Sequence, residues 1–64
     1  MKIVLNGEPK EVQSTTLDDL LDECGLSGRV ATAVNQQFVS SSERAGITLA
    51  EGDAIEVLAP MQGG

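Results

Sequence analysis

The chain has 64 residues, with ten acidic and four basic side chains that give a formal net charge of −6, so it forms one small domain without room for an internal active-site cleft. The negative charge disfavours binding to nucleic acids and anionic membranes, and no apolar run approaches the roughly 20 residues needed to cross a bilayer. A single cysteine and an opening segment without signal-peptide features indicate a cytoplasmic protein.

The first predicted element is a β-hairpin. Residues 2–5 are mainly apolar, and the dipeptide Asn6-Gly7 that follows is the one that most readily forms a type I′ turn. The second arm is predicted over residues 10–13. Pro9 has no amide hydrogen, which confines it to a turn or to an edge strand.

A helix is predicted to begin near Thr16, whose hydroxyl can cap the first turn, and to end at Gly25. Its apolar stripe, at helical spacing, consists of Leu17, Leu20, Leu21 and Cys24. With no histidine in the chain, Cys24 is interpreted as a small buried hydrophobe rather than a reactive nucleophile. The acidic residues between these positions are interpreted as a solvated face, with contact to a basic partner as the alternative.

Two strands are predicted after a loop at Gly28. Residues 30–34 are small or β-branched, which favours a buried strand. Residues 35–37 are predicted to turn the chain into a short strand at Phe38-Val39. The polar run 40–44 is predicted to be a surface loop.

A turn at residues 51–53 precedes the last predicted strand, residues 54–58, in which Ile55 and Val57 point inward. Val4 and Leu58 fall on the other face of their strands. They are predicted to form an exposed docking patch beside the root of the tail, with scattered surface apolarity or a different strand register as the alternatives.

Together the elements predict an α+β fold, with one helix packed on one face of a mixed sheet of four or five strands. A hairpin cannot hold parallel strands, so any parallel pair must come from a later strand reached through the helix crossover. We expect the first strand to pair with the last at the centre of the sheet. This topology is the β-grasp. Residues 1–59 are predicted to form the domain, and residues 60–64 a flexible tail that lies next to the chain's start.

The tail ends in a diglycine. Pro60 begins it stiffly, whereas Gly63 and Gly64 carry no side chain that would obstruct a narrow cleft. A terminal carboxylate is ionised at neutral pH and can attack the α-phosphate of ATP. The acyl-adenylate so formed is open to a sulfur nucleophile. Since two terminal glycines also arise by chance, the tail alone leaves a frayed end as an alternative.

Five segments in their order and spacing resemble the ThiS family of sulfur carriers over essentially the whole chain. They are residues 2–7, 16–21, 30–35, 51–53 and the closing Gln62-Gly63-Gly64. The resemblance implies a ubiquitin-like β-grasp protein of thiamin biosynthesis that is a protein cosubstrate and not an enzyme.

The resemblance also implies a role for each part of the tail. Gly64 would be adenylated with ATP by a ThiF-like enzyme and converted to a thiocarboxylate with sulfur from a cysteine desulfurase or another persulfide donor. The thiazole synthase ThiG would then consume it. Pro60, Met61, Gln62 and Gly63 would contact the partners, and no metal or cofactor is expected on the chain itself.

Other functional classes share the same fold and tail. One is a sulfur carrier for molybdopterin or a protein modifier attached as an isopeptide, and another is an interaction module whose tail is inert. The chain also departs from the family pattern after Phe38-Val39. Where members commonly carry a proline and an arginine before a Ser-Glu-Trp-like segment, this chain has residues 40–44 with the sequence Ser-Ser-Ser-Glu-Arg, without the aromatic.

Overall fold

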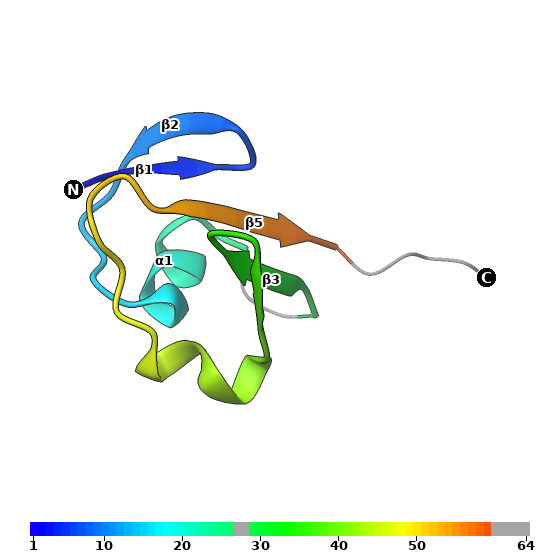
Figure 1. The fold of residues 1–64 in the computed structure, drawn as a ribbon. Helices are drawn as coiled ribbons and strands as arrows, with labels where there is room; N and C mark the ends of the chain where they lie inside the picture. The colour runs from blue at the N-terminus through cyan, green and yellow to red at the C-terminus, as the bar shows by residue number, and fades with distance from the viewer. Residues whose placement is uncertain (27–28, 60–64) are drawn as a thin grey trace.

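The computed structural model describes residues 1–26 and 29–59 (Figure 1). The elements in these ranges are, in chain order, β1 (Lys2–Leu5), β2 (Glu8–Glu11), α1 (Leu17–Glu23), β3 (Ala31–Val34), β4 (Gln37–Val39), the 3-10 helix η1 (Ser41–Gly46) and β5 (Ala54–Leu58). No helix in the described ranges is long and apolar enough to cross a membrane. The loop predicted at Gly28 and the tail predicted at residues 60–64 lie outside the described residues.

The strands form one mixed sheet in the order β2-β1-β5-β3-β4. The central strands β1 and β5 are parallel, and the other neighbouring pairs are antiparallel. With α1 on one face of the sheet (Figure 1), the predicted fold class is confirmed. One detail of the prediction is wrong. Because β1 and β5 run in the same direction, the end of β5 lies at the opposite end of the sheet from Met1.

Both hairpin turns use residues with positive φ. Asn6 and Gly7 have φ values of 50° and 85°, as the type I′ prediction requires. The second turn has no glycine, and Asn35 and Gln36 adopt φ values of 50° and 71°. Asparagine tolerates this conformation because its short side chain makes local hydrogen bonds. The Asn35 side-chain oxygen accepts a hydrogen bond of 3.0 Å from the backbone N–H of Ala54, which ties this turn to the start of β5.

The second arm of the first hairpin begins two residues earlier than predicted. β2 covers Glu8–Glu11 and includes Pro9, which the sheet tolerates because β2 is an edge strand with one neighbour. After β2, the backbone N–H of Val12 donates to the Met1 carbonyl oxygen at 2.8 Å, and the Val12 side chain is buried. The arm therefore ends in the core.

The core lies between α1 and the sheet. Thr16 caps the helix, since its hydroxyl oxygen accepts a hydrogen bond of 3.2 Å from the Asp19 backbone, and Gly25 has a φ of 70° beyond the helix end. Cys24 is half-buried and packs against the core. The buried apolar side chains are Ile3, Val12, Leu17, Leu20, Leu21, Val39, Leu49, Ile55 and Val57. The predicted leucine stripe and the inward direction of the β5 residues are thus confirmed.

The prediction of a surface loop at residues 40–44 is wrong. The segment enters the 3-10 helix η1, and the Glu43 carboxylate stabilises the start of this helix. The carboxylate accepts a hydrogen bond of 3.3 Å from the Ser40 backbone N–H and one of 2.9 Å from the Ser40 hydroxyl. A serine followed three residues later by glutamate is a signal for such a helix start, and it is readable in the sequence. Moreover, Arg44 is buried, with only 6% of its surface exposed.

Arg44 binds the inner side of β3 and the residue that precedes it. Its Nε donates to Thr32 Oγ1 at 3.1 Å, and one of its terminal nitrogens donates to the Val30 carbonyl oxygen. Thr32 is itself buried, and its hydroxyl donates to the Val39 carbonyl oxygen at 2.7 Å. Within residues 1–26 and 29–59, no carboxylate forms an ion pair with this guanidinium. Neutral acceptors therefore compensate the cost of burying the charge.

Glu23, the last residue of α1, ties the end of the helix to the segment that precedes it. Its carboxylate accepts hydrogen bonds from the backbone N–H groups of Gln13, at 3.2 Å, and Ser14, at 3.0 Å, and from the Ser14 hydroxyl. The pKa of Glu23 lies below the ordinary glutamate value. The main cause is the hydrogen bond from the Ser14 hydroxyl, and the next is the hydrogen bond from the Gln13 N–H. These bonds favour the ionised form, so they stabilise the fold above the ordinary carboxyl pKa.

This contribution should be lost as the pH falls through the lowered pKa of Glu23. We expect Glu23→Gln to be less stable than the wild type at pH 7, and the difference in unfolding temperature to shrink as the pH approaches 3. Thermal unfolding followed by circular dichroism at a series of pH values measures this. Glu8→Gln, an exposed exchange in β2, is the matched control. A Glu23→Gln difference that stays constant with pH would contradict the assignment.

Candidate functional site

The five predicted tail residues, Pro60, Met61, Gln62, Gly63 and Gly64, lie outside the described residues. What can be described is the root of the tail, the part of the domain from which it starts. That root is the last part of β5. The sheet pairs β5 with β1 through Ala54 and Ile55 only, whereas β3 accompanies it as far as Leu58. On the β1 side, residues 56–58 extend past the parallel ladder (Figure 1).

Asn6 continues the ladder where β1 stops. Its side-chain oxygen accepts from the Val57 backbone N–H at 2.9 Å, and its side-chain nitrogen donates to the Val57 carbonyl oxygen at 3.2 Å. Its backbone N–H donates to the Ile55 carbonyl oxygen at 2.9 Å. The same residue thus forms the first turn and fixes the end of β5. Sequence reasoning identified the turn at Asn6-Gly7 and missed this second role.

Val4 and Leu58 lie on the same face of the sheet but do not adjoin. Val4 pairs with Ala54 at the start of β5, and Leu58 is four residues further along that strand, about 13 Å away at the usual strand rise. The exposed side chain of Glu56 points to the same face between them. Val4 is half-buried, whereas Leu58 is 67% exposed, so only Leu58 stands at the tail root.

Phe38 is the large apolar residue that accompanies Leu58. It is 73% exposed, and across the sheet it pairs with Ala33, which in turn pairs with Glu56. Ala31 pairs with Leu58 in the next row. Together Ala31, Ala33, Phe38 and Leu58 form what we call the tail-root patch, on the sheet face opposite α1. A shallow hollow of about 130 Å³ lies among these side chains and Glu56.

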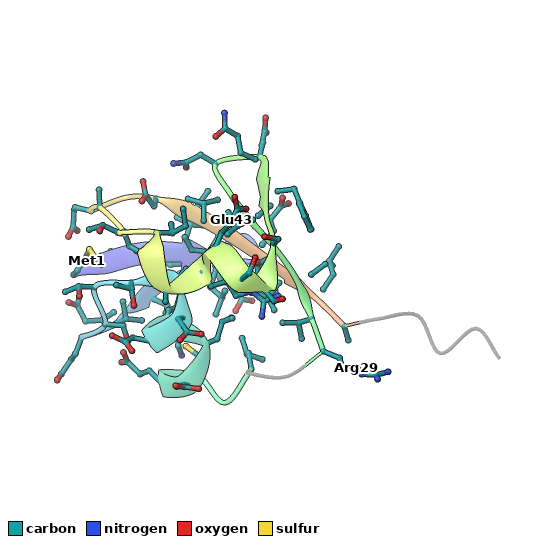
Figure 2. All side chains as sticks on the ribbon, turned by 90° about the horizontal axis from the view of Figure 1, so that it is seen from below. Met1, Arg29 and Glu43 are labelled. Atoms are coloured by element: carbon teal, nitrogen blue, oxygen red, sulfur yellow. The ribbon has the colours of Figure 1, made fainter. Side chains whose placement is uncertain are left out.

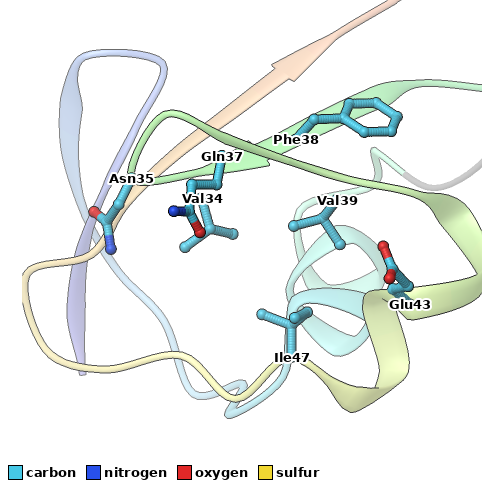
Figure 3. A pocket seen from close by; sticks show the side chains of 7 residues that line it. All are labelled: Val34, Asn35, Gln37, Phe38, Val39, Glu43 and Ile47. Atoms are coloured by element: carbon cyan, nitrogen blue, oxygen red, sulfur yellow. The ribbon is translucent and has the colours of Figure 1, made fainter.

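A larger hollow of about 440 Å³ lies between β4 and η1 (Figure 3). Val34, Val39 and Ile47 supply apolar side chains, and Gln37 and Glu43 supply polar ones. The Glu43 carboxylate is already bound to Ser40, and the described lining contains neither a cysteine nor a second carboxylate. The hollow therefore lacks the paired groups of an acid–base or nucleophilic site.

The four basic residues are distributed unevenly. Lys2 begins β1 at the end of the sheet away from the tail root, Lys10 lies in the edge strand β2, and Arg44 is buried. Arg29 is exposed, two residues before Ala31. Figure 2 shows its side chain at the end of the molecule from which β5 leads out of the sheet. Among the described residues, it forms no ion pair.

The model of the ThiS family matches residues 3–64, nearly the whole chain. The chain belongs to the ThiS family. A sulfur carrier protein ThiS of Thermus thermophilus is 39% identical over 61 residues, which cover 94% of this chain and 95% of that protein. A thiazole synthase of Paramagnetospirillum magneticum is 38% identical over 66 residues, which cover all of this chain and 20% of that protein. This ThiS-family chain thus corresponds to a fifth of that relative.

Solved structures agree with the ThiS assignment. The crystal structure of the thiamine biosynthesis protein ThiS of Geobacter metallireducens has a TM-score of 0.86 and 26% identity, with both chains covered in full. The solution structure of a thiamine biosynthesis protein of that organism has a TM-score of 0.79 and 26% identity, over all of this chain and 88% of the other. The resemblance to the ThiS family and the β-grasp prediction are therefore confirmed.

Proposed function

We propose that this protein carries sulfur as a thiocarboxylate at Gly64, in the cytoplasm, for the thiazole ring of thiamin. The observation that supports this proposal best is the family match, which extends to Gly64 and so includes the diglycine. As a member of the ThiS family, the chain is a sulfur carrier of thiamin biosynthesis, and the match to a thiazole synthase is consistent with that pathway. The chemistry at Gly64 is the part that we add.

The proposed activation has two steps. A carboxylate oxygen of Gly64 attacks the α-phosphorus of ATP on a ThiF-like enzyme, which forms the acyl-adenylate and releases pyrophosphate. A persulfide supplied by a cysteine desulfurase or a related donor then attacks the carbonyl carbon and displaces AMP. A thiol cleaves the resulting acyl disulfide, which leaves the thiocarboxylate on Gly64 and a disulfide on the donor.

The chain's own residues position the tail and do not catalyse these steps. Asn6 and β3 hold the last residues of β5 at the edge of the folded domain. Gly63 and Gly64 carry no β-carbon, so an enzyme can enclose the backbone closely. From Pro60 to Gly64 the tail can span roughly 16 Å when extended, a length that reaches into a partner's active site.

Intact-mass spectrometry tests the proposal. We expect incubation with the activating enzyme, ATP and a persulfide donor to add the mass difference between one sulfur and one oxygen atom. Deletion of Gly64 should abolish the change, and so should omission of ATP. An unchanged mass for the wild-type chain under all these conditions would refute the carrier chemistry. Lysine-linked conjugates in place of the thiocarboxylate would instead identify a protein modifier.

A further inference from the structure

We propose that the tail-root patch is the surface through which this chain binds thiazole synthase, and that Arg29 selects a carboxylate at the edge of that enzyme's binding surface. The inference rests on the proposed carrier function and adds to it the docking surface and the chemistry of the partner. The partner surface is apolar at its centre, with an acidic side chain opposite Arg29 and a basic one opposite Glu56.

The apolar centre follows from what the sheet leaves uncovered. α1 packs on the other face, so Phe38 and Leu58 remain 73% and 67% exposed although both are large and apolar. They stand on either side of two alanines, and this arrangement leaves the hollow of about 130 Å³. Aromatic residues with a neighbouring hollow are typical anchors of protein interfaces. In this chain the anchor is Phe38, the sole aromatic residue.

The position of the patch limits what can cover it. Leu58 is the last residue of β5, and the six residues from it to Gly64 span at most about 20 Å. A protein that takes Gly64 into its active site must therefore lie within that distance of the patch. Thiazole synthase is the partner that the comparisons favour, because one thiazole synthase contains a segment similar to this whole chain within its own polypeptide. Such a connection holds the two units at high effective concentration.

The charge at this end of the molecule is unusual for this chain. The net charge is −6, yet the exposed basic residue at this end is Arg29, which forms no ion pair with any described carboxylate. Arginine is enriched at interfaces, where its guanidinium can bind a carboxylate through two hydrogen bonds. Glu56 lines the hollow beside the patch. Two opposite charges at separate places define an orientation for the partner, which a purely apolar patch does not.

Calorimetric titration of the full chain with thiazole synthase tests the surface. We expect Phe38→Ala to raise the Kd about 10- to 100-fold. We expect Arg29→Glu to raise it about 10-fold at low salt, with a smaller effect at high salt because the ionic contact is screened. Val4→Ala, on the same face away from the tail root, and Lys10→Glu, which changes the net charge as much as Arg29→Glu, should leave the Kd within about twofold. Thermal unfolding of each variant verifies that it is folded.

Two further measurements separate this inference from the carrier function. The mass gain at Gly64 is measured for each variant with the activating enzyme, ATP and a persulfide donor in the absence of thiazole synthase, and sedimentation equilibrium measures self-association. Unchanged binding of thiazole synthase by Phe38→Ala and Arg29→Glu overturns the inference, whatever these substitutions do to thiocarboxylate formation or to self-association. By contrast, absence of any mass gain in the wild-type chain refutes the proposed function, irrespective of the binding data.

Discussion

Arg44→Ala should unfold far below the wild-type temperature, with a loss of about 2–4 kcal/mol in the free energy of unfolding. For a domain of this size, such a loss lowers the midpoint by roughly 10–25 °C. The substitution removes the donors that bind Thr32 and the Val30 carbonyl, and it leaves a space under η1 where a 6%-exposed side chain stood. Thermal and urea unfolding followed by circular dichroism measure the effect.

Two other variants separate the causes of this loss. Arg29→Ala removes an exposed arginine and should stay within about 0.5 kcal/mol of the wild type. Arg44→Met fills much of the same volume without a charge, and it should recover most of the stability, because a buried charge can often be replaced by an apolar side chain. Equal stability of Arg44→Ala and the wild type would contradict this account.

Gly63→Ala should lower the rate of thiocarboxylate formation about 100-fold while leaving the free energy of unfolding unchanged. The added β-carbon restricts the backbone and obstructs an enzyme that encloses the tail, and a displacement of about 1 Å at the reacting carboxylate costs this much in rate. Mass spectrometry at timed intervals gives the rate, and urea unfolding gives the stability of the same sample.

Gly46→Ala is the matched control for this exchange. Gly46 lies in η1, and a β-carbon added there would meet no atom within 4 Å. The variant should therefore form the thiocarboxylate at the wild-type rate. A Gly63→Ala chain that is activated normally would show that the position needs no clearance. A chain that unfolds instead would show that Gly63 has a structural role.

The elements that could be predicted are those with local signals. The Thr16 cap, the Asn6-Gly7 turn and the alternation of Ile55 and Val57 each depend on a few neighbouring residues, and the structure confirms all of them. The helical segment after Ser40 carried a local signal as well, the glutamate three residues later, but the surrounding serines favoured a loop. A short polar run is thus ambiguous without its contacts.

Other features depend on residues that are distant in the chain. Arg44 was predicted to be at the surface because it ends the polar run of residues 40–44, which is typical of a loop. Its acceptors, Thr32 and the Val30 carbonyl, are 12 and 14 residues away, in β3 and just before it, and the return of the chain through β4 into η1 brings Arg44 to them. Similarly, Asn6 reaches Val57 across 51 residues, and the turn signal at Asn6 contains nothing that identifies this contact.

The sequence by itself determined the order of the elements, the family and the diglycine at which we propose the chemistry, because these depend on residue types and their spacing along the chain. Only the tertiary structure decided which apolar residue stands beside Leu58. Alternation predicted that Val4 and Leu58 share a face, but their distance depends on the register between β1 and β5, which the burial of Ile55 and the turn at Asn6 set together. That register places Val4 at the far end of β5, and the pairing through β3 brings Phe38 to the tail root instead.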